Sequence, residues 1–215
     1  MKHIVKQEEP QVFSDWKGLS SMDWQPSYDI LSGPVKRVVK QALMAEQGYL
    51  CCYCERRLAE EDSHIEHFRP QSHPGTDPLD FYNMLCSCQN RLKKGVPRHC
   101  GILKDNWFDE NTLISPLDPS CEDRFAYTGN GEINPRNPDD SAAKETIKKV
   151  GLDLLKLIDL RAKAIEPFTD GDLTDEEFEN FVKGYLEIAD GGIWGEFYTT
   201  ILYLFVGRVN GSKNS

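Results

Sequence analysis

Residues 51–70 read CCYCERRLAEEDSHIEHFRP, and they hold the features from which a fold and a chemistry can be predicted. Cys51 and Cys54 have the C-x-x-C spacing of a zinc knuckle, in which a tight turn brings two thiolates to one tetrahedral ion. Glu66 and His67 follow shortly afterwards in the same stretch. The question this stretch raises is whether Glu66 and His67 form a catalytic pair or a polar turn.

A closed structural zinc site needs two further ligands, and the candidates are Cys86, Cys88, His99 and Cys100. The prediction selects Cys88, which follows an apolar strand-like segment, and Cys100, which lies where the next helix is expected. Four thiolates leave no open coordination position, so the ion would be structural. Cys52, Cys86 and Cys121 are then expected to serve in packing.

The alternative to a zinc site is a group of buried free thiols. Most of the seven cysteines and four of the five histidines lie between residues 51 and 100. Disulfides are disfavoured in a cytoplasmic chain, so this clustering favours metal binding.

Glu66 and His67 are neighbours, so on a strand they would face opposite sides, whereas at a strand end both could converge on one ion. A carboxylate suits a hard cation such as Mg²⁺, and a neutral imidazole can take a proton from water near pH 7. Together they could direct hydroxide at a phosphodiester. A Glu-His dipeptide is more often an exposed polar turn, and the two residues alone leave both alternatives open.

The net charge of −10 is unevenly distributed, because residues 106–215 carry 11 basic and 21 acidic side chains. Residues 86–104 contain five basic side chains and no acid. Such a strip suits a phosphate-bearing substrate, and a solvated loop is an equally good interpretation. Arg69 could bind a phosphate or pair with an acid. The strip consists of Arg91, Lys93, Lys94, Arg98 and Lys104.

A length of 215 residues allows one sizeable domain, or a small domain with a wrapped extension, and an apolar fraction of 39% is enough for a real core. The first ten residues lack the layout of a signal peptide, which predicts a cytoplasmic protein. The longest apolar run, residues 197–206, is half the length that spans a bilayer and is expected to be a buried helix.

The pattern along the chain predicts an α+β fold that is mainly helical. The first expected helix starts near Pro34 and ends at Gly48, and a hairpin turns at Asn130 and Gly131. Two further helices are expected over residues 141–150 and 152–167. A third is expected to begin at a capping box formed by Thr174 and Glu177 and to end at the glycines 191–192. The last is expected over the apolar run 197–206.

Along the chain, the cysteine pair is followed by IEHFRP, FYNML, a further cysteine and HCG. This order resembles that of the HNH endonucleases (ββα-metal, or His-Me finger, nucleases). The resemblance implies a ββα core braced by zinc on Cys51, Cys54, Cys88 and Cys100. It implies that Glu66 binds a catalytic Mg²⁺ or Mn²⁺, that His67 is the general base, and that Asn83 orients His67.

The family places a third signature residue, Asn or His, on the helix just after the last cysteine. Gly101 stands at that position here, so either Asn90, His99 or Lys104 supplies the function, with His99 as the added metal ligand, or the function is missing. His64 and His73 are expected to be ordinary loop residues.

Residues 46–165 further resemble PtuB-type HNH proteins of Septu and retron-associated anti-phage systems. This implies a nuclease effector that acts with a PtuA-type ATPase on phage DNA or host tRNA, and indirectly with a retron reverse transcriptase and its RNA–DNA product. The alternative function is a non-catalytic zinc-binding adaptor. The expected organisation is an N-terminal arm and scaffold helix (1–48), a nuclease core (49–110), and a hairpin with a helical layer that could dock the partner (111–215).

Overall fold

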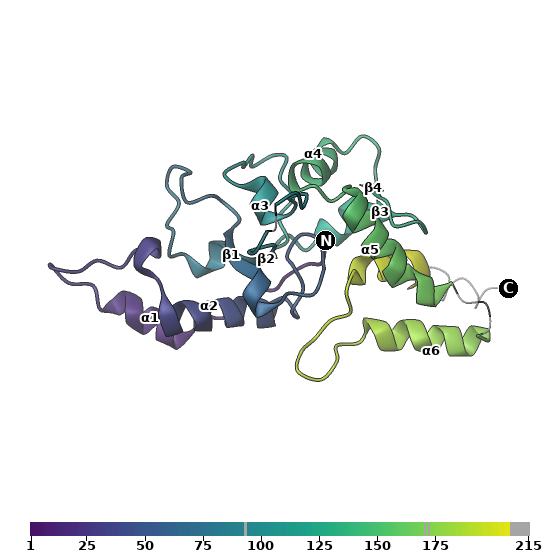
Figure 1. The fold of residues 1–215 in the computed structure, drawn as a ribbon, viewed down its shortest axis with the longest axis horizontal. Helices are drawn as coiled ribbons and strands as arrows, with labels where there is room; N and C mark the ends of the chain where they lie inside the picture. The colour runs from purple at the N-terminus through teal and green to yellow at the C-terminus, as the bar shows by residue number, and fades with distance from the viewer. Residues whose placement is uncertain (93, 170, 172, 207–215) are drawn as a thin grey trace.

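The computed structural model describes residues 1–92, 94–169, 171 and 173–206, which form a mixed α and β structure (Figure 1). Within these ranges no helix has the length and apolar character needed to cross a bilayer. The helices are α1 Gln11–Gly18, α2 Gly33–Glu46, α3 Gly101–Lys104, α4 Ser141–Val150, α5 Leu155–Ile165, α6 Asp175–Leu186 and α7 Tyr198–Ile201. The strands are β1 Ser63–His67, β2 Met84–Cys88, β3 Phe125–Tyr127 and β4 Ile133–Pro135.

Strands β1 and β2 form an antiparallel hairpin at the centre of the molecule, with Ser63 opposite Cys88 and His67 opposite Met84. Every residue of β2 is buried, as expected for a strand that is covered on both faces. Helix α2 packs against both strands and lies below them in Figure 1. The expected helix from Pro34 is confirmed, and its buried side chains include Val39 and Leu43.

The N-terminal segment differs from the prediction, because it contains α1, which was not expected. Phe13 of this helix is fully buried and stacks on Trp16, with ring centroids 6.0 Å apart. Helix α1 packs on α2. Its short apolar pattern becomes helical because packing on a neighbouring helix stabilises it more than local propensity does.

The C-terminal half contains the predicted hairpin, β3 and β4, and the predicted helices α4 and α5. The capping box at Thr174 and Glu177 is confirmed at the start of α6. One expectation there was wrong. Helix α6 ends at Leu186 rather than at the glycine pair, which lies in a tight loop closed by pairing of Ala189 with Ile193. The last apolar run is helical as predicted, and consists of α7 followed by a π-helical segment, Leu202–Val206.

The buried apolar side chains form two clusters. The larger one includes residues from Met1 to Leu157 and surrounds the central hairpin. The smaller one joins α5, α6 and the last segment through Ile165, Phe168, Val182, Ile201 and Phe205.

The β3–β4 turn lies directly against α5. The buried Arg161 donates hydrogen bonds to the carbonyl oxygens of Gly131 and Leu152. Gly131 has φ +89°, and a Cβ atom there would lie 2.2 Å from the carbonyl oxygen of Ile158. Only glycine therefore fits this turn, because both the backbone conformation and the close approach exclude a side chain.

We predict that Gly131→Ala lowers the free energy of unfolding by more than about 1 kcal/mol, since it adds strain at a positive φ and a clash with α5. Urea unfolding followed by circular dichroism measures the change. Gly129→Ala is the matched control, because a Cβ at Gly129 has no neighbour within 4 Å. Equal stability of the two variants would contradict the predicted role of this contact.

Candidate metal centre and active site

Four cysteine sulfurs meet in the buried centre of the molecule. The Sγ atoms of Cys51, Cys54, Cys88 and Cys100 all lie within 4.8 Å of one another. The first two lie in a tight turn closed by pairing of Leu50 with Arg57. Cys88 ends β2 and Cys100 immediately precedes α3. The structure thus brings together the four cysteines that the spacing predicts.

The donor set of this centre fits a metal ion such as zinc. Burial and the neighbouring sulfurs raise the pKa of the Cys100 thiol well above its ordinary value, because several negative charges cannot share a dry site without a balancing cation. A divalent ion supplies that charge, and four sulfurs are the donors of a closed tetrahedral zinc site.

His99 lies beside the cysteine group rather than beside Glu66. Its Nδ1 atom is 3.0 Å from Sγ of Cys100 and 3.8 Å from Sγ of Cys88. Burial lowers the pKa of His99 to about 4, so the ring is neutral. With its hydrogen on Nδ1, the ring would donate to a sulfur of the metal group, as outer partners of metal sites do. The catalytic metal role of His99 stays a prediction, and in this structure its Nδ1 atom contacts the cysteine sulfurs.

Glu66 and His67 line one open cavity of about 700 Å³, together with His64, Arg98 and Gly101. His67 is the last residue of β1. Two neighbouring residues reach the same space because the strand ends there, which is the arrangement in which both side chains can act on one substrate.

Glu66 is a buried carboxylate whose Oε1 atom has two close partners and whose Oε2 atom faces His64 at 3.6 Å. Its Oε1 atom accepts a hydrogen bond from the Tyr53 hydroxyl at 3.1 Å and lies 2.8 Å from Nζ of Lys104. Burial raises the pKa of Glu66, but the interactions with His64 and Lys104 outweigh it and lower the pKa below its ordinary value. Glu66 is therefore ionised, and Oε2 is available to a cation.

His67 is held in one tautomer by a backbone carbonyl. Its Nε2 atom lies 2.9 Å from the carbonyl oxygen of Pro78, which can only accept, so the hydrogen of the neutral ring is on Nε2. The Nδ1 atom carries the lone pair and contacts the Gln71 amide at 3.2 Å. Burial lowers the pKa of His67 below its ordinary value. The Tyr28 ring packs edge-on against the imidazole, with centroids 4.6 Å apart.

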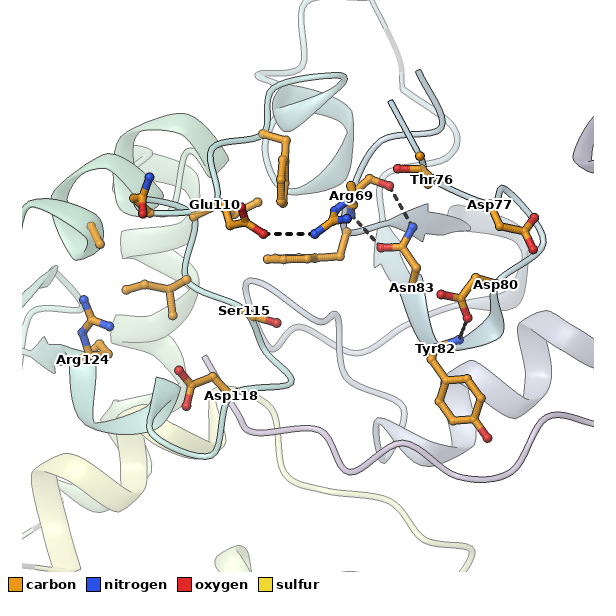
Figure 2. Close-up of a pocket in the computed structure, with 17 residues that line it drawn as sticks. Arg69, Thr76, Asp77, Asp80, Tyr82, Asn83, Glu110, Ser115, Asp118 and Arg124 are labelled. Carbon is orange, nitrogen blue, oxygen red and sulfur yellow. Dashed lines mark hydrogen bonds and ion pairs between the residues drawn. The ribbon is translucent and has the colours of Figure 1, made fainter. Parts of the chain in front are cut away.

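Asn83 closes the loop that carries Pro78. Figure 2 shows its side chain paired with the backbone of Arg69, accepting from the Arg69 N–H and donating to the Arg69 carbonyl, both at 2.8 Å. The Phe68 N–H donates to the Asn83 carbonyl. These bonds fix the base of the loop between β1 and β2. Asn83 thus supports the position of His67 through the backbone and contacts its ring through no hydrogen bond in the described part of the chain.

The predicted cations lie in different environments. Arg69 pairs with Glu110 at 3.2 Å, so of the two alternatives for this residue the structure contains the acid pairing (Figure 2). Arg91, Lys94 and Arg98 are exposed, and Lys93 lies outside the described residues. Lys104 requires a correction: it is 2% exposed and paired with Glu66, so it is no part of an exposed basic strip.

Several residues of the site were missed by the sequence analysis. His64 was expected in a loop but lies in β1, with Nε2 3.6 Å from Oε2 of Glu66. The alternation of side chains along a strand places residues 64 and 66 on one face, and this was the available signal. No comparable sequence signal identifies Tyr28, Tyr53, Gln71 or Pro78, which reach the site through the tertiary fold.

Two known proteins are similar to about half of this chain. No family model matches the chain. Over 126 residues it is 32% identical to a Vibrio cholerae (serotype O1 biovar El Tor) protein named "Retron Vc95 putative HNH endonuclease", covering 57% of this chain and 58% of the relative. Over 127 residues it is 29% identical to an Escherichia coli protein named "Retron Ec83 putative HNH endonuclease", covering 53% and 49%.

Both similarities confirm the resemblance to retron HNH endonucleases. The chain spans about half the length of these curated relatives.

We predict that the purified chain holds one tightly bound metal ion and that Cys88→Ser abolishes its retention, because three sulfurs do not close a tetrahedral site. Atomic absorption on desalted protein measures the metal content. Cys86→Ser is the matched control, since Cys86 lies on the same strand outside the group of four. Equal loss of metal from both variants would contradict the assignment of the ligands.

Proposed function

We propose that this protein is a metal-dependent HNH endonuclease that hydrolyses phosphodiester bonds in nucleic acid as the effector of an anti-phage defence system. The observation that carries the proposal is that ionised Glu66 and neutral His67 face one open cavity beside a four-cysteine centre. The names of the two relatives support the same activity. Phage DNA and host tRNA are the proposed substrates.

The proposed core is a ββα-metal unit made of β1, β2 and α3 and braced by zinc on the four cysteines. The proposed division of the chain is an N-terminal arm and scaffold helix (1–48), this core (49–110) and a C-terminal region (111–215). The protein is proposed to act in the cytoplasm.

In the proposed reaction, Nδ1 of His67 takes a proton from a water molecule that replaces the Gln71 amide. The water oxygen forms a bond to phosphorus, one P–O ester bond breaks, and the leaving oxygen takes a proton from solvent. Pro78 holds the hydrogen on Nε2, so the imidazolium that forms is oriented and partly stabilised. A Mg²⁺ or Mn²⁺ ion at Oε2 of Glu66 would stabilise the charge of the leaving oxygen.

The exposed cations near the cavity support binding of a polyanion. Arg98 lines the cavity, and Arg91 and Lys94 lie in the same exposed segment. A chain with a net charge of −10 binds a long polyanion weakly on its own. We therefore propose that a PtuA-type ATPase supplies further binding surface, and that the acidic region 111–215 contacts it. A retron reverse transcriptase with its RNA–DNA product is the proposed indirect partner.

We predict that His67→Ala lowers the rate of Mn²⁺-dependent cleavage by about 10²- to 10⁴-fold, the usual contribution of a positioned general base. The assay uses DNA and tRNA substrates, with and without the ATPase, and includes the metal content and thermal unfolding of each variant.

His73→Ala is the matched control, because His73 lies in the following loop outside the cavity of Glu66 and His67. Full cleavage and full phage protection by the His67 variant would contradict the proposal and would favour the non-catalytic adaptor.

A further inference from the structure

The space in front of Glu66 is closed to any side chain from the start of α3. A Cβ atom on Gly101 would lie 2.4 Å from Oε2 of Glu66 and 2.7 Å from Nε2 of His64. A Cβ atom closer than 3.0 Å to another heavy atom forces that atom or the backbone to move. Because residue 101 is glycine, there is a space in front of α3 that is bordered by Oε2 of Glu66 and Nε2 of His64.

Three residues were candidates for the further ligand of the catalytic metal ion, and none of them brings a neutral donor atom to Oε2 of Glu66. Asn90 is an exposed residue at the rim of the cavity. His99 contacts the cysteine sulfurs. Lys104 is a cation and lies against the other oxygen of Glu66, Oε1.

His64 has the geometry that these residues lack. It and Glu66 are two residues apart on β1 and face the same cavity. Their Nε2 and Oε2 atoms are 3.6 Å apart, which is too long for a good hydrogen bond. Neighbouring ligand atoms of an octahedral ion lie about 3 Å apart when each is about 2.1 Å from the metal. The Nδ1 atom of His64 is buried and has no hydrogen-bond partner among the described residues.

We propose that Nε2 of His64 and Oε2 of Glu66 together hold a divalent metal ion in this cavity, with water and substrate phosphate oxygens in the remaining positions. An imidazole beside a carboxylate favours Mn²⁺ and later transition metals over Mg²⁺, which prefers oxygen ligands. His64 on β1 thereby supplies the metal ligand that Gly101, which has no side chain, cannot supply from α3. The inference rests on the proposed function, because this ion is the one that the cleavage reaction would use.

The test is Mn²⁺ binding to the zinc-loaded full chain, measured by the loss of the electron paramagnetic resonance signal of free Mn²⁺. We expect His64→Ala to weaken this binding at least about tenfold, a loss that even outer partners of metal sites can cause. His73→Ala should bind as the wild type does. His64→Asp should retain binding but lower the ratio of Mn²⁺ to Mg²⁺ affinity, because the site then offers only oxygen ligands.

A second measurement needs no variant. Mn²⁺ at this site should broaden the nuclear magnetic resonance signals of the His64 ring at substoichiometric concentration more than those of His73, which does not line the cavity. Unchanged Mn²⁺ affinity in His64→Ala, an unchanged affinity ratio in His64→Asp, or a sharp His64 signal would each overturn the assignment.

Cleavage by the same wild-type preparation separates this inference from the proposed function. Cleavage together with Mn²⁺ binding that is indifferent to His64 would overturn the role of His64 and leave the nuclease proposal standing. Mn²⁺ binding that depends on His64, without cleavage of any substrate in the presence of the ATPase, would support the metal site and contradict the nuclease.

Discussion

The meeting of four buried sulfurs at one point is the constraint around which this structure is organised. The sulfurs come from three places in the chain, the turn after α2, the end of β2 and the residue before α3. A divalent ion bound by these sulfurs would link the three segments. In the register of the central hairpin, Cys88 is paired with Ser63. A slip by one residue would turn His64 and Glu66 to the opposite face.

Glu66 connects the cysteine centre to the cavity. A buried carboxylate is costly unless it is paired, and here Lys104 and Tyr53 both contact the same oxygen. Tyr53 lies within the C-x-x-C turn, between Cys52 and Cys54, so the knuckle that gathers the sulfurs also orients the acid. Lys104 comes from α3, and its Nζ atom also donates to the carbonyl oxygen of His67. The turn that holds Cys51 and Cys54, the Glu66 carboxylate and helix α3 are therefore joined by one hydrogen-bond network.

The features that could be predicted from the sequence are those set by local spacing. The C-x-x-C pair, the Asn130-Gly131 turn and the capping box at Thr174 each depend on a few neighbouring residues, and the structure contains them all. The features that were missed depend on tertiary position. Lys104 counted as a surface charge because composition does not report burial. The place of His64 depends on where β1 begins, and element boundaries are the least certain part of a sequence prediction.

The central claim is that one metal ion braces the hairpin and a second is held at its end by Glu66. Anomalous diffraction from crystals of the full chain soaked in Mn²⁺, recorded at the zinc and manganese edges, tests both parts together. We expect a zinc peak among the four cysteine sulfurs and a manganese peak beside Oε2 of Glu66, within ligand distance of His64. Absence of a zinc peak from the cysteine centre, or manganese bound elsewhere with the Glu66 cavity filled only by water, would contradict it.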